Sequence, residues 1–385
     1  MKHNWTYKKL GEVATLTGGF TPKADELFPK GKYPYFKVSD MNTAGNEVVL
    51  TKTPSFVLDS KKFFPKGAIV FPKNGAAVST NKKRILGQDS IVDLNTCTAI
   101  LTSDINVKFA YYWFCKLDFK TLVRGGALPT LDLKGLRSLQ IPIPSLDKQK
   151  SIVQELDGIN HLIDLQEEQL REYDRLAQSL FYTTFGDPVS NPKGWEVKKL
   201  SEIVSPQCTL SYGIVQPGDG VEEGVPVVRP VDLIDTFVGI KGLKKTTVEI
   251  ASSYKRTVLT GHELLMCVRG TIGIVGLALE ELSGCNVTRG ITPILFQEEA
   301  SKWLVFHIMK TEEMKVKLAE LTRGIALKGI NMADVRKLPI IYPPLPLQQT
   351  FAAQIEAIEQ QKALIRRSLD QTRTLLAARM QYYFE

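Results

Sequence analysis

The 385-residue sequence predicts an α+β protein in which two similar α/β domains are separated by two long antiparallel coiled-coil helices. Three observations lead to this prediction. Several motifs occur twice, strand-like segments alternate with glycine and proline, and two long stretches carry apolar residues at heptad spacing. A chain of this length is also too long for one ordinary hydrophobic core.

The repeat is visible at three places. The segment 5–13 reads WTYKKLGEV, and the segment 195–203, which lies 190 residues later, reads WEVKKLSEI. The segment RGGAL at 124–128 returns as RGIAL at 323–327, and LQIPIPSL at 139–146 returns as LPIIYPPL at 338–345, now at an offset of 199. Loop insertions between two copies of one fold would produce this drift of nine residues. A pseudo-twofold chain suggests two similar sites.

The composition bounds the class of protein. With 43% hydrophobic and 23% charged residues, the sequence is typical of a soluble globular protein. It has no apolar run of the roughly 18 residues that a membrane helix requires, and its first residues do not resemble a signal peptide. The 5 cysteines and 4 histidines are scattered. We therefore expect a cytoplasmic protein with reduced, buried thiols and without a metal site.

The charge is unevenly distributed along the chain. The formal net charge is +8, but residues 1–145 carry 21 Lys and Arg against 11 Asp and Glu, a net of +10. Residues 146–189 carry 4 against 9, a net of −5. The basic first domain suggests a polyanionic partner, and a merely solvated surface is the alternative.

The expected elements follow the repeat. In residues 1–145 we predict strands at 33–38, 68–71, 85–86 and 97–101, and a helix at 107–120 whose aromatic residues pack in the core. In the second copy we predict strands at 225–228, 263–268, 272–279 and 291–296, and a helix at 303–321. The predicted domains are 1–145 and 187–344, and the long helices are 146–186 and 345–385.

The long helices are predicted from a heptad seam that is sustained for four repeats. Proline near the start of each segment fits a first helical turn. The apolar seam positions are Ile152, Leu156, Ile159, Ile163, Leu170, Tyr173 and Leu180 in the first helix, and Phe351, Ile355, Ile358, Ile365, Leu369 and Leu376 in the second. Gln166 interrupts the first seam and Lys362 the second, at different repeat positions. This pattern predicts two helices that pack on each other in one register and leave other faces for partner proteins.

The sequence lacks the motifs of common catalytic sites. It contains neither a phosphate-binding loop nor a dinucleotide fingerprint. The glycine-containing segment 270–276 lacks their spacing, and we interpret it as strand, turn and strand. The segment YPPL at 342–345 lacks the amide or acid of an amino-methyltransferase motif. We therefore predict no catalytic residues, no bound cofactor and no metal.

Four features, in order and duplicated, resemble the specificity subunit of type I restriction-modification systems over essentially the whole chain. They are GGFTP at 18–22 with YPYFKVSD at 33–40; the strand and glycine turn at 66–75 and again at 261–273; the helix start at 141–149 and its copy; and FGDP at 185–188 leading to NPKGW at 191–195. The second copy departs from the pattern at 210–218, which suggests that the two domains read different DNA sequences.

This resemblance implies a non-catalytic DNA-binding subunit with a bipartite target. Each globular target-recognition domain would read one half-site, and the helix pair would set the unread spacer between them. The helices would dock two methylation subunits, which methylate adenine with S-adenosylmethionine. Restriction and translocation subunits would join the complex, so S-adenosylmethionine, ATP and Mg²⁺ are expected on partner subunits only.

Base readout favours Arg or Lys on guanine and Asn or Gln on adenine. The candidates for DNA contact are Lys23, Lys37, Lys73, Asn74, Lys82, Lys83, Arg84 and Arg124 in the first domain, and Arg229, Lys255, Arg256, Arg269, Arg289 and Arg323 in the second. The run 81–84 is the strongest candidate, with a solvated hairpin tip as its alternative. Arg124 and Arg323 are equivalent in the repeat, and each is a phosphate contact or a structural hydrogen-bond donor.

Three other functions fit parts of the sequence. A stand-alone bipartite DNA-binding regulator would bind DNA tightly without methylation subunits. A DNA methyltransferase or nuclease with degenerate motifs would bind S-adenosylmethionine by itself. A coiled-coil scaffold without a DNA role fits poorly with the net charge of +10 in the first domain.

Overall fold

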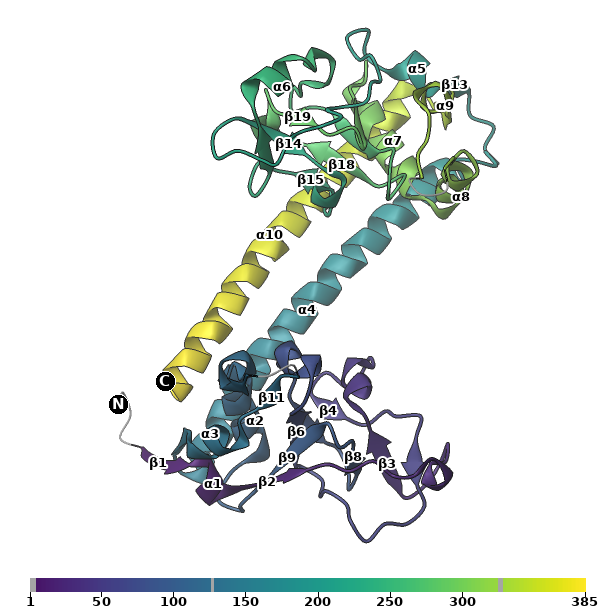
Figure 1. The fold of residues 1–385 in the computed structure, drawn as a ribbon. Coiled ribbons are helices and arrows are strands. Elements are labelled where there is room, and N and C mark those ends of the chain that lie inside the picture. Colours follow the sequence, from purple (N-terminus) through teal and green to yellow (C-terminus); the bar gives the residue numbers. More distant parts are fainter. Residues whose placement is uncertain (1–4, 126–127, 325–327) are drawn as a thin grey trace. The chain divides into compact units, whose positions relative to one another are not determined.

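The computed structural model describes residues 5–125, 128–324 and 328–385, which divide into two units. Unit 1 comprises Met1–Glu167 and Arg367–Glu385, and unit 2 comprises Glu168–Arg366. Each unit therefore contains one globular module with one end of each long helix (Figure 1). The centres of the repeated RGGAL and RGIAL segments lie outside the described residues. The predicted domain boundaries at 145, 186 and 344 remain predictions.

The module of unit 1 is built on a mixed sheet of five strands. Their order is β2-β9-β6-β7-β4, and a second sheet has the order β5-β3-β8. The five-stranded sheet comprises β2 (Ala14–Gly18), β9 (Thr96–Leu101), β6 (Ile69–Pro72), β7 (Arg84–Leu86) and β4 (Val49–Leu50). The smaller sheet comprises β5 (Phe56–Val57), β3 (Tyr33–Phe36) and β8 (Ile91–Val92). The predicted strands are present in these sheets.

Two short pairings close the module of unit 1. Strand β1 (Thr6–Lys9) pairs antiparallel with β12 (Gln140–Ile143), which joins the first predicted motif to the helix start. Strand β10 (Val123–Arg124) pairs with β11 (Thr130–Leu131). The short helix α1 (Leu10–Val13) follows β1 along the chain, and the short helix α3 (Leu133–Ser138) connects β11 to β12.

Helix α2 (Val107–Lys116) carries the aromatic cluster into the core of unit 1. The Asn106 side chain accepts a hydrogen bond from the Phe109 amide and caps the helix start. All five aromatic residues from 109 to 114 are buried, which confirms their prediction as core. The helix ends at Lys116 and not at 120 as predicted, because Leu117 is extended and Asp118 starts a separate turn, η4 (Phe119–Leu122).

Unit 2 repeats this topology. Its sheets have the orders β15-β18-β17-β20 and β16-β14-β19, and β13 (Val197–Lys199) pairs with β21 (Pro339–Ile341). The first sheet comprises β15 (Phe237–Val238), β18 (Val275–Ala278), β17 (Leu264–Cys267) and β20 (Ile291–Ile294), and the second comprises β16 (Lys244–Thr246), β14 (Val225–Val228) and β19 (Asn286–Val287). The segment 270–274 forms the turn between β17 and β18, as predicted.

One strand of unit 1 has no full counterpart in unit 2. Where β2 pairs with β9 along five residues, the equivalent segment retains a single bridge between Val204 and Phe296. Pro206 follows in this segment, and proline has no amide hydrogen to donate to a neighbouring strand. The repeat is therefore conserved in topology but not in strand length.

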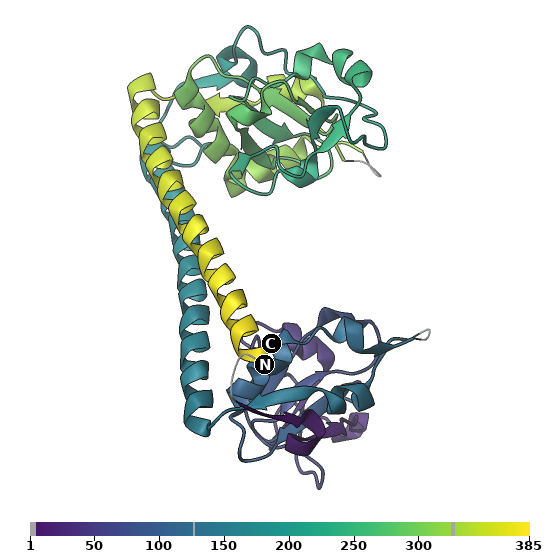
Figure 2. The same ribbon diagram turned by 90° about the vertical axis from the view of Figure 1, so that its left-hand side faces the viewer.

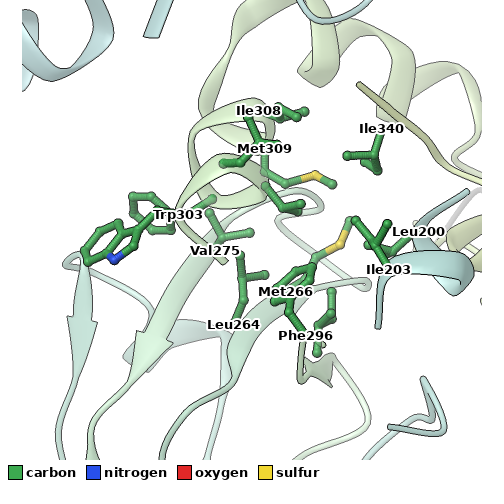
Figure 3. Close-up of a cluster of buried hydrophobic side chains, with 14 of the residues drawn as sticks. Leu200, Ile203, Leu264, Met266, Val275, Phe296, Trp303, Ile308, Met309 and Ile340 are labelled. Carbon is green, nitrogen blue, oxygen red and sulfur yellow. The ribbon is translucent and has the colours of Figure 1, made fainter. Parts of the chain in front are cut away.

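The core of unit 2 lies between its larger sheet and the helices that cover it. Figure 3 shows Trp303, Ile308 and Met309 of α7 (Glu299–Lys310) beside residues of β17 and β18. We predicted one helix at 303–321, but the structure has two, because Thr311 is extended and its hydroxyl accepts from the Met314 amide to start α8 (Glu312–Glu320). The remaining helices are α5 (Leu200–Ile203), α6 (Val248–Ser252) and α9 (Met332–Arg336).

The predicted long helices are α4 (Leu146–Phe185) and α10 (Leu345–Phe384), each of 40 residues. An equivalent glutamine fixes each start, because the fully buried side chains of Gln149 and Gln348 donate to the carbonyls of Pro144 and Pro343. Every predicted seam position is buried or half-buried. Within each unit the two helix segments run antiparallel, and their ribbons can be followed in Figures 1 and 2.

The two polar interruptions of the seam each form a bond across the helix pair, although the Gln166 Oε1 atom is buried without a partner. In unit 1 the Gln166 side-chain amide donates to the Ser368 hydroxyl at 2.8 Å. In unit 2 the buried Lys362 ammonium is 2.6 Å from Glu359 and 2.7 Å from Asp174. Removing one partner of such a buried pair costs far more than an exposed ion pair is worth, so these contacts favour one register.

All five cysteines are free thiols. Cys97, Cys267 and Cys285 are buried, and burial raises the pKa of the Cys97 thiol to about 11. Cys208 is half-buried and Cys115 is exposed, so the prediction of buried thiols is wrong for these two. None of the helices in the described ranges is long and apolar enough to cross a membrane.

Candidate nucleic-acid interface

The loops that follow β6 and β17 form the centre of the candidate interface in each unit. Asn74 bridges to Thr130, and Arg269 bridges to Gly329 at the equivalent place in the repeat. Each residue lies two positions after the end of a central strand, so a rigid sheet positions it. Lys73 lies beside Asn74, and its ammonium fills the space over Gly18.

The same contacts bring the two equivalent arginines into this region. Arg124 pairs with Thr130 in unit 1, and Arg323 pairs with Gly329 in unit 2. Each exposed guanidinium also forms an ion pair with a half-buried carboxylate at the start of the following short helix, Asp132 for Arg124 and Asp334 for Arg323. The Gly135 amide and then the Arg124 guanidinium hold the pKa of Asp132 below its usual value. Exposed ion pairs are weak, so both arginines can exchange their carboxylate for a phosphate.

Lys37 and Arg229 also occupy equivalent positions. Each precedes a short turn, and its backbone amide donates to an aspartate three residues later, Asp40 at 2.7 Å and Asp232 at 2.8 Å. The exposed Lys37 ammonium lies 5.8 Å from the centre of the Tyr35 ring. The Arg229 guanidinium is instead held by both oxygens of Asp232.

The sequence of 210–218 departs from the first copy, but the backbone does not. The Phe20 amide donates to the Val92 carbonyl at 2.9 Å, and the Ile214 amide donates to the Val287 carbonyl at 2.8 Å. In both copies the preceding glycine, Gly19 or Gly213, has no room for a Cβ atom, which would lie within 2.2 Å of a backbone carbonyl oxygen. The side chains at this opening therefore differ on the same backbone path.

In unit 2 this opening supplies an aromatic platform. Tyr212 lies under Arg269, with the guanidinium carbon 5.2 Å from the ring centre. Tyr212 also lines a surface hollow that contains Lys255 and Arg256, both of which are exposed. The amide of Arg289, another candidate, donates to Ile214 of the same opening. The structure thus gathers most candidates of unit 2 around one set of loops, and stacked arginine with an aromatic ring suits nucleic-acid contact.

The run 81–84 is not a solvated hairpin tip, and two of its three cations are already bound within the fold. The Lys83 ammonium donates to the Leu117 carbonyl at 2.7 Å and lies 4.1 Å from the centre of the Phe119 ring. Lys83 is only 2% exposed, and burial lowers its pKa to about 8. Arg84 donates to the carbonyls of Lys83 and Met41. In this structure both side chains are engaged within the fold, and their selection as DNA contacts stays a prediction.

The remaining candidates of unit 1 are less closely grouped. Lys82 is half-buried and its ammonium donates to the Asn42 side chain. Lys23 is exposed at the start of η1 (Ala24–Glu26). Phe64 of unit 1 and Leu259 of unit 2 form equivalent backbone pairings. Counting back from them, two exposed lysines that we did not select, Lys61 and Lys62, occupy the positions of Arg256 and Thr257. Aligning the two copies through these strands would have found them.

The side chains of this interface offer positive charge and hydrogen-bond donors. In the described parts of the chain, no group of three or more His, Cys, Asp and Glu side chains is placed to hold a metal ion. The interface contributes guanidinium, ammonium, amide and phenol groups on loops that the two sheets position. These groups suit the edges of bases and the phosphates of a duplex.

Two copies of one fold, each with basic residues on equivalent loops, define a repeated polyanion-recognition protein. Residues 2–173 and 192–372 each match the model of the type I restriction modification DNA specificity domain. Because these matches include most of the chain, it belongs to the type I restriction-modification DNA specificity family. As a member of this family it supplies DNA specificity and is not itself catalytic.

Named relatives and solved structures agree with this assignment. The chain is 22% identical over 388 residues to the EcoBI specificity subunit of Escherichia coli, covering 92% of this chain and 79% of that protein. It is 22% identical over 404 residues to the MjaIX specificity subunit of Methanocaldococcus jannaschii, covering 92% and 87%. The fold is similar to an S subunit from M. genitalium, with a TM-score of 0.55 and 15% identity over 99% of this chain and 96% of that one.

A second structural neighbour comes from work on complex assembly and conformational transition of the type I R-M system. It has a TM-score of 0.60 and 18% identity, and the match covers 99% of this chain and 97% of that chain. At these identities the likeness concerns the fold. It agrees with the repeated modules and long helices described above.

Proposed function

We propose that the chain recognises a two-part target in double-stranded DNA, with one half-site read by residues 1–145 and the other by residues 187–344. The observation that carries this proposal is the equivalence of Asn74 with Arg269 and of Arg124 with Arg323 on the same loops of two repeated folds. Equivalent backbones with different side chains suit two different half-sites, since phosphate contacts position a protein and base contacts specify the sequence.

The long helices are proposed to set the unread spacer and to dock two methylation subunits, with restriction and translocation subunits joining them. Each helix has 40 residues and is therefore about 60 Å long. Two half-sites that lie one helical turn apart on the same face of a duplex are separated by roughly 34–36 Å. This separation is shorter than the length of each helix. S-adenosylmethionine, ATP and Mg²⁺ would be bound by the partner subunits, and the complex would act in the cytoplasm.

Methylation mapping of genomic DNA tests the proposed function. Cells that contain the chain with its methylation subunit should carry methylated adenines in one bipartite motif, and deletion of the chain should remove that motif. The purified chain alone should transfer no methyl group. Methyl transfer by the chain alone, or an unchanged methylation pattern after its deletion, would contradict the proposal.

Single substitutions test the assignment of half-sites. Asn74→Ala should relax recognition of one half-site and Arg269→Ala recognition of the other, at about 1–3 kcal/mol for each lost base contact. Arg124→Ala should weaken binding to all sequences and lower the salt dependence, as expected for a phosphate contact. If Asn74→Ala altered both half-sites equally, the two modules would not read DNA separately.

A further inference from the structure

A cleft of about 650 Å³ in unit 2 is not used by the proposed DNA interface. Its walls come from α7, the loop 233–236 and the glycine-containing turn 271–274, which resembled a nucleotide loop only superficially. Apolar side chains line much of it, among them Leu233, Ile234, Ile272 and Phe306. Ile234 is 86% exposed, so the apolar lining of the cleft reaches the surface of the unit.

The cleft is also cationic. Its lining includes four cations, Lys310, Lys315, Lys362 and Arg366, against two carboxylates, Asp174 and Asp235. Lys362 and Arg366 are paired within the fold, to Asp174 and Asp235 respectively. Lys310 and Lys315 are exposed, and the Lys310 ammonium lies 5.1 Å from the centre of the Phe306 ring. Lys315 also forms an ion pair with Glu312 at 2.7 Å, but this pair is exposed and therefore weak, so both lysines can turn toward an incoming anion at little cost.

A smaller cavity of about 240 Å³ adjoins this cleft and shares Asp174, Phe306, Lys310 and Lys315 with it. His307 lines the smaller cavity and is only 8% exposed. Its Nε2 atom is buried without a hydrogen-bond partner. An unsatisfied buried nitrogen is costly, so it marks a place where a further polar group would be stabilising.

The repeat provides an internal comparison. The equivalent cleft of unit 1 has a volume of about 780 Å³, and Glu47, Tyr111 and Cys115 take the places of Asp235, Phe306 and Lys310. Its lining carries three carboxylates, Glu47, Asp157 and Asp164, and one cation, Lys108. With histidine neutral, the formal charge of the lining is thus −2 in unit 1 and +2 in unit 2. The cleft is repeated in the fold, but its charge is reversed.

We propose that the unit 2 cleft binds an acidic and partly apolar segment of the methylation subunit. This rests on the proposed function, in which the chain assembles with that subunit. The apolar lining favours a protein over DNA, because protein interfaces bury apolar and aromatic groups at their centre whereas DNA interfaces are more polar. The acidic cleft of unit 1 repels the same segment, so this contact holds one of the two methylation subunits only.

The test uses the full chain with the purified methylation subunit of the same restriction-modification system. Ile234→Glu and Lys315→Glu change the cleft, and Val231→Glu is the matched control, because Val231 is also exposed and does not line the cleft. Titration and native mass spectrometry measure the affinity and the number of bound methylation subunits. Each cleft variant should lose at least about ten-fold affinity for one bound copy, and the control should retain both copies at the wild-type affinity.

Each other outcome has a separate meaning. If the wild-type chain bound no methylation subunit, the proposed function would fail with the inference. If the wild type and all three variants bound it equally, the inference alone would be wrong. If the cleft variants lost both copies, the restriction to one copy would be wrong. If Lys315→Glu weakened DNA binding and left assembly unchanged, the cleft would belong to the DNA interface, which also overturns the inference.

Discussion

At the scale of single residues, His307 shows how burial determines protonation. Its ring is packed among Phe181, Phe306 and Phe351. Desolvation, with smaller contributions from the charges of Lys310 and Lys362, lowers its pKa to about 3. The folded protein therefore keeps this imidazole neutral at pH values where the unfolded chain takes up a proton.

This burial predicts a specific loss of stability in acid. The unfolded histidine has a pKa near 6.5 and the folded one is lower, so its contribution is complete above pH 6.5 and is lost as the pH falls toward 3. The loss should be about 1.4 kcal/mol per pH unit below 6.5. His307→Phe should remove that slope in urea unfolding measured between pH 5 and pH 7. His161→Phe, a change at an exposed histidine, should leave the slope unchanged.

Lys83 provides a second prediction at this scale. Because its ammonium is buried against Leu117 and Phe119, Lys83→Glu should place a carboxylate beside a carbonyl and destabilise unit 1 by about 3 kcal/mol or more. Lys82→Glu should cost little stability, because Lys82 is half-buried and bonded to a surface amide. Chemical unfolding measures both variants. Equal stabilities for the two would show that Lys83 is not a packing residue in solution.

The sequence could not distinguish these two lysines. Both belong to one basic run, and basic runs are usually solvated. The burial of Lys83 depends on Leu117 and Phe119, which are more than thirty residues away in the sequence and reach it only through the tertiary fold. Asn74 and Arg269, in contrast, were selected because their side chains suit the edges of bases and because both were expected in loops. The sequence shows which side chains have chemistry suited to DNA contact. It does not show which of them are exposed to solvent.

At the scale of elements, the heptad pattern predicted the long helices well because one physical rule governs them. A seam residue must be covered by the other helix, so the period alone indicates which side chains are buried. The break at Thr311 was not predicted, because the residues on both sides favour helix and the side-chain cap that ends α7 is a local choice. The unit 2 counterpart of strand β2 is reduced to one bridge because of Pro206. This proline is visible in the sequence, but the strand prediction did not take it into account.

The helix pair predicts how spacer length can be changed. Four residues inserted after Leu165 and four after Ser368 should lengthen both helices by about 6 Å and keep the contacts on either side of the insertions, apart from the Glu167–Arg373 ion pair, which they separate. The methylated motif should then gain one to two base pairs between unchanged half-sites. Insertion after Leu165 alone should lower stability, because it shifts Lys362 against Asp174 or Arg379 against Glu155. Methylation mapping measures the spacer length and thermal unfolding measures the stability. An unchanged spacer in the doubly lengthened protein would falsify the hypothesis that the helix pair sets the spacer.

At the scale of the whole molecule, the repeat explains why one chain can present two different surfaces on one scaffold. The two modules share their sheet order, their glycine contacts and their glutamine-fixed helix starts. They differ in the side chains at 74 and 269, at 18 and 212, and around the equivalent clefts. Duplication followed by divergence at exposed positions accounts for both observations.

The ends of the two long helices have one more consequence. Helix α4 leads through the segment 186–194 to Trp195, whose indole donates to the Phe185 carbonyl at 2.9 Å. At the end of α10, Tyr383 stacks on Trp5 with ring centres 6.4 Å apart. In both places, therefore, the tryptophan of the repeated motif packs against the end of a long helix.

A circularly permuted chain should therefore fold and act normally. Joining residue 385 to Trp5 through a copy of the segment 186–194, and opening the chain between Val189 and Ser190, would place the second module first. The permuted protein should direct methylation to the same bipartite motif as the natural order, because each module would keep its own tryptophan contact with a helix end. Loss of methylation with retained folding, measured by circular dichroism, would show that the natural order of the two modules is needed. If methylation is retained, the order of the two modules along the chain has no role in the mechanism and reflects only the evolutionary history of the gene.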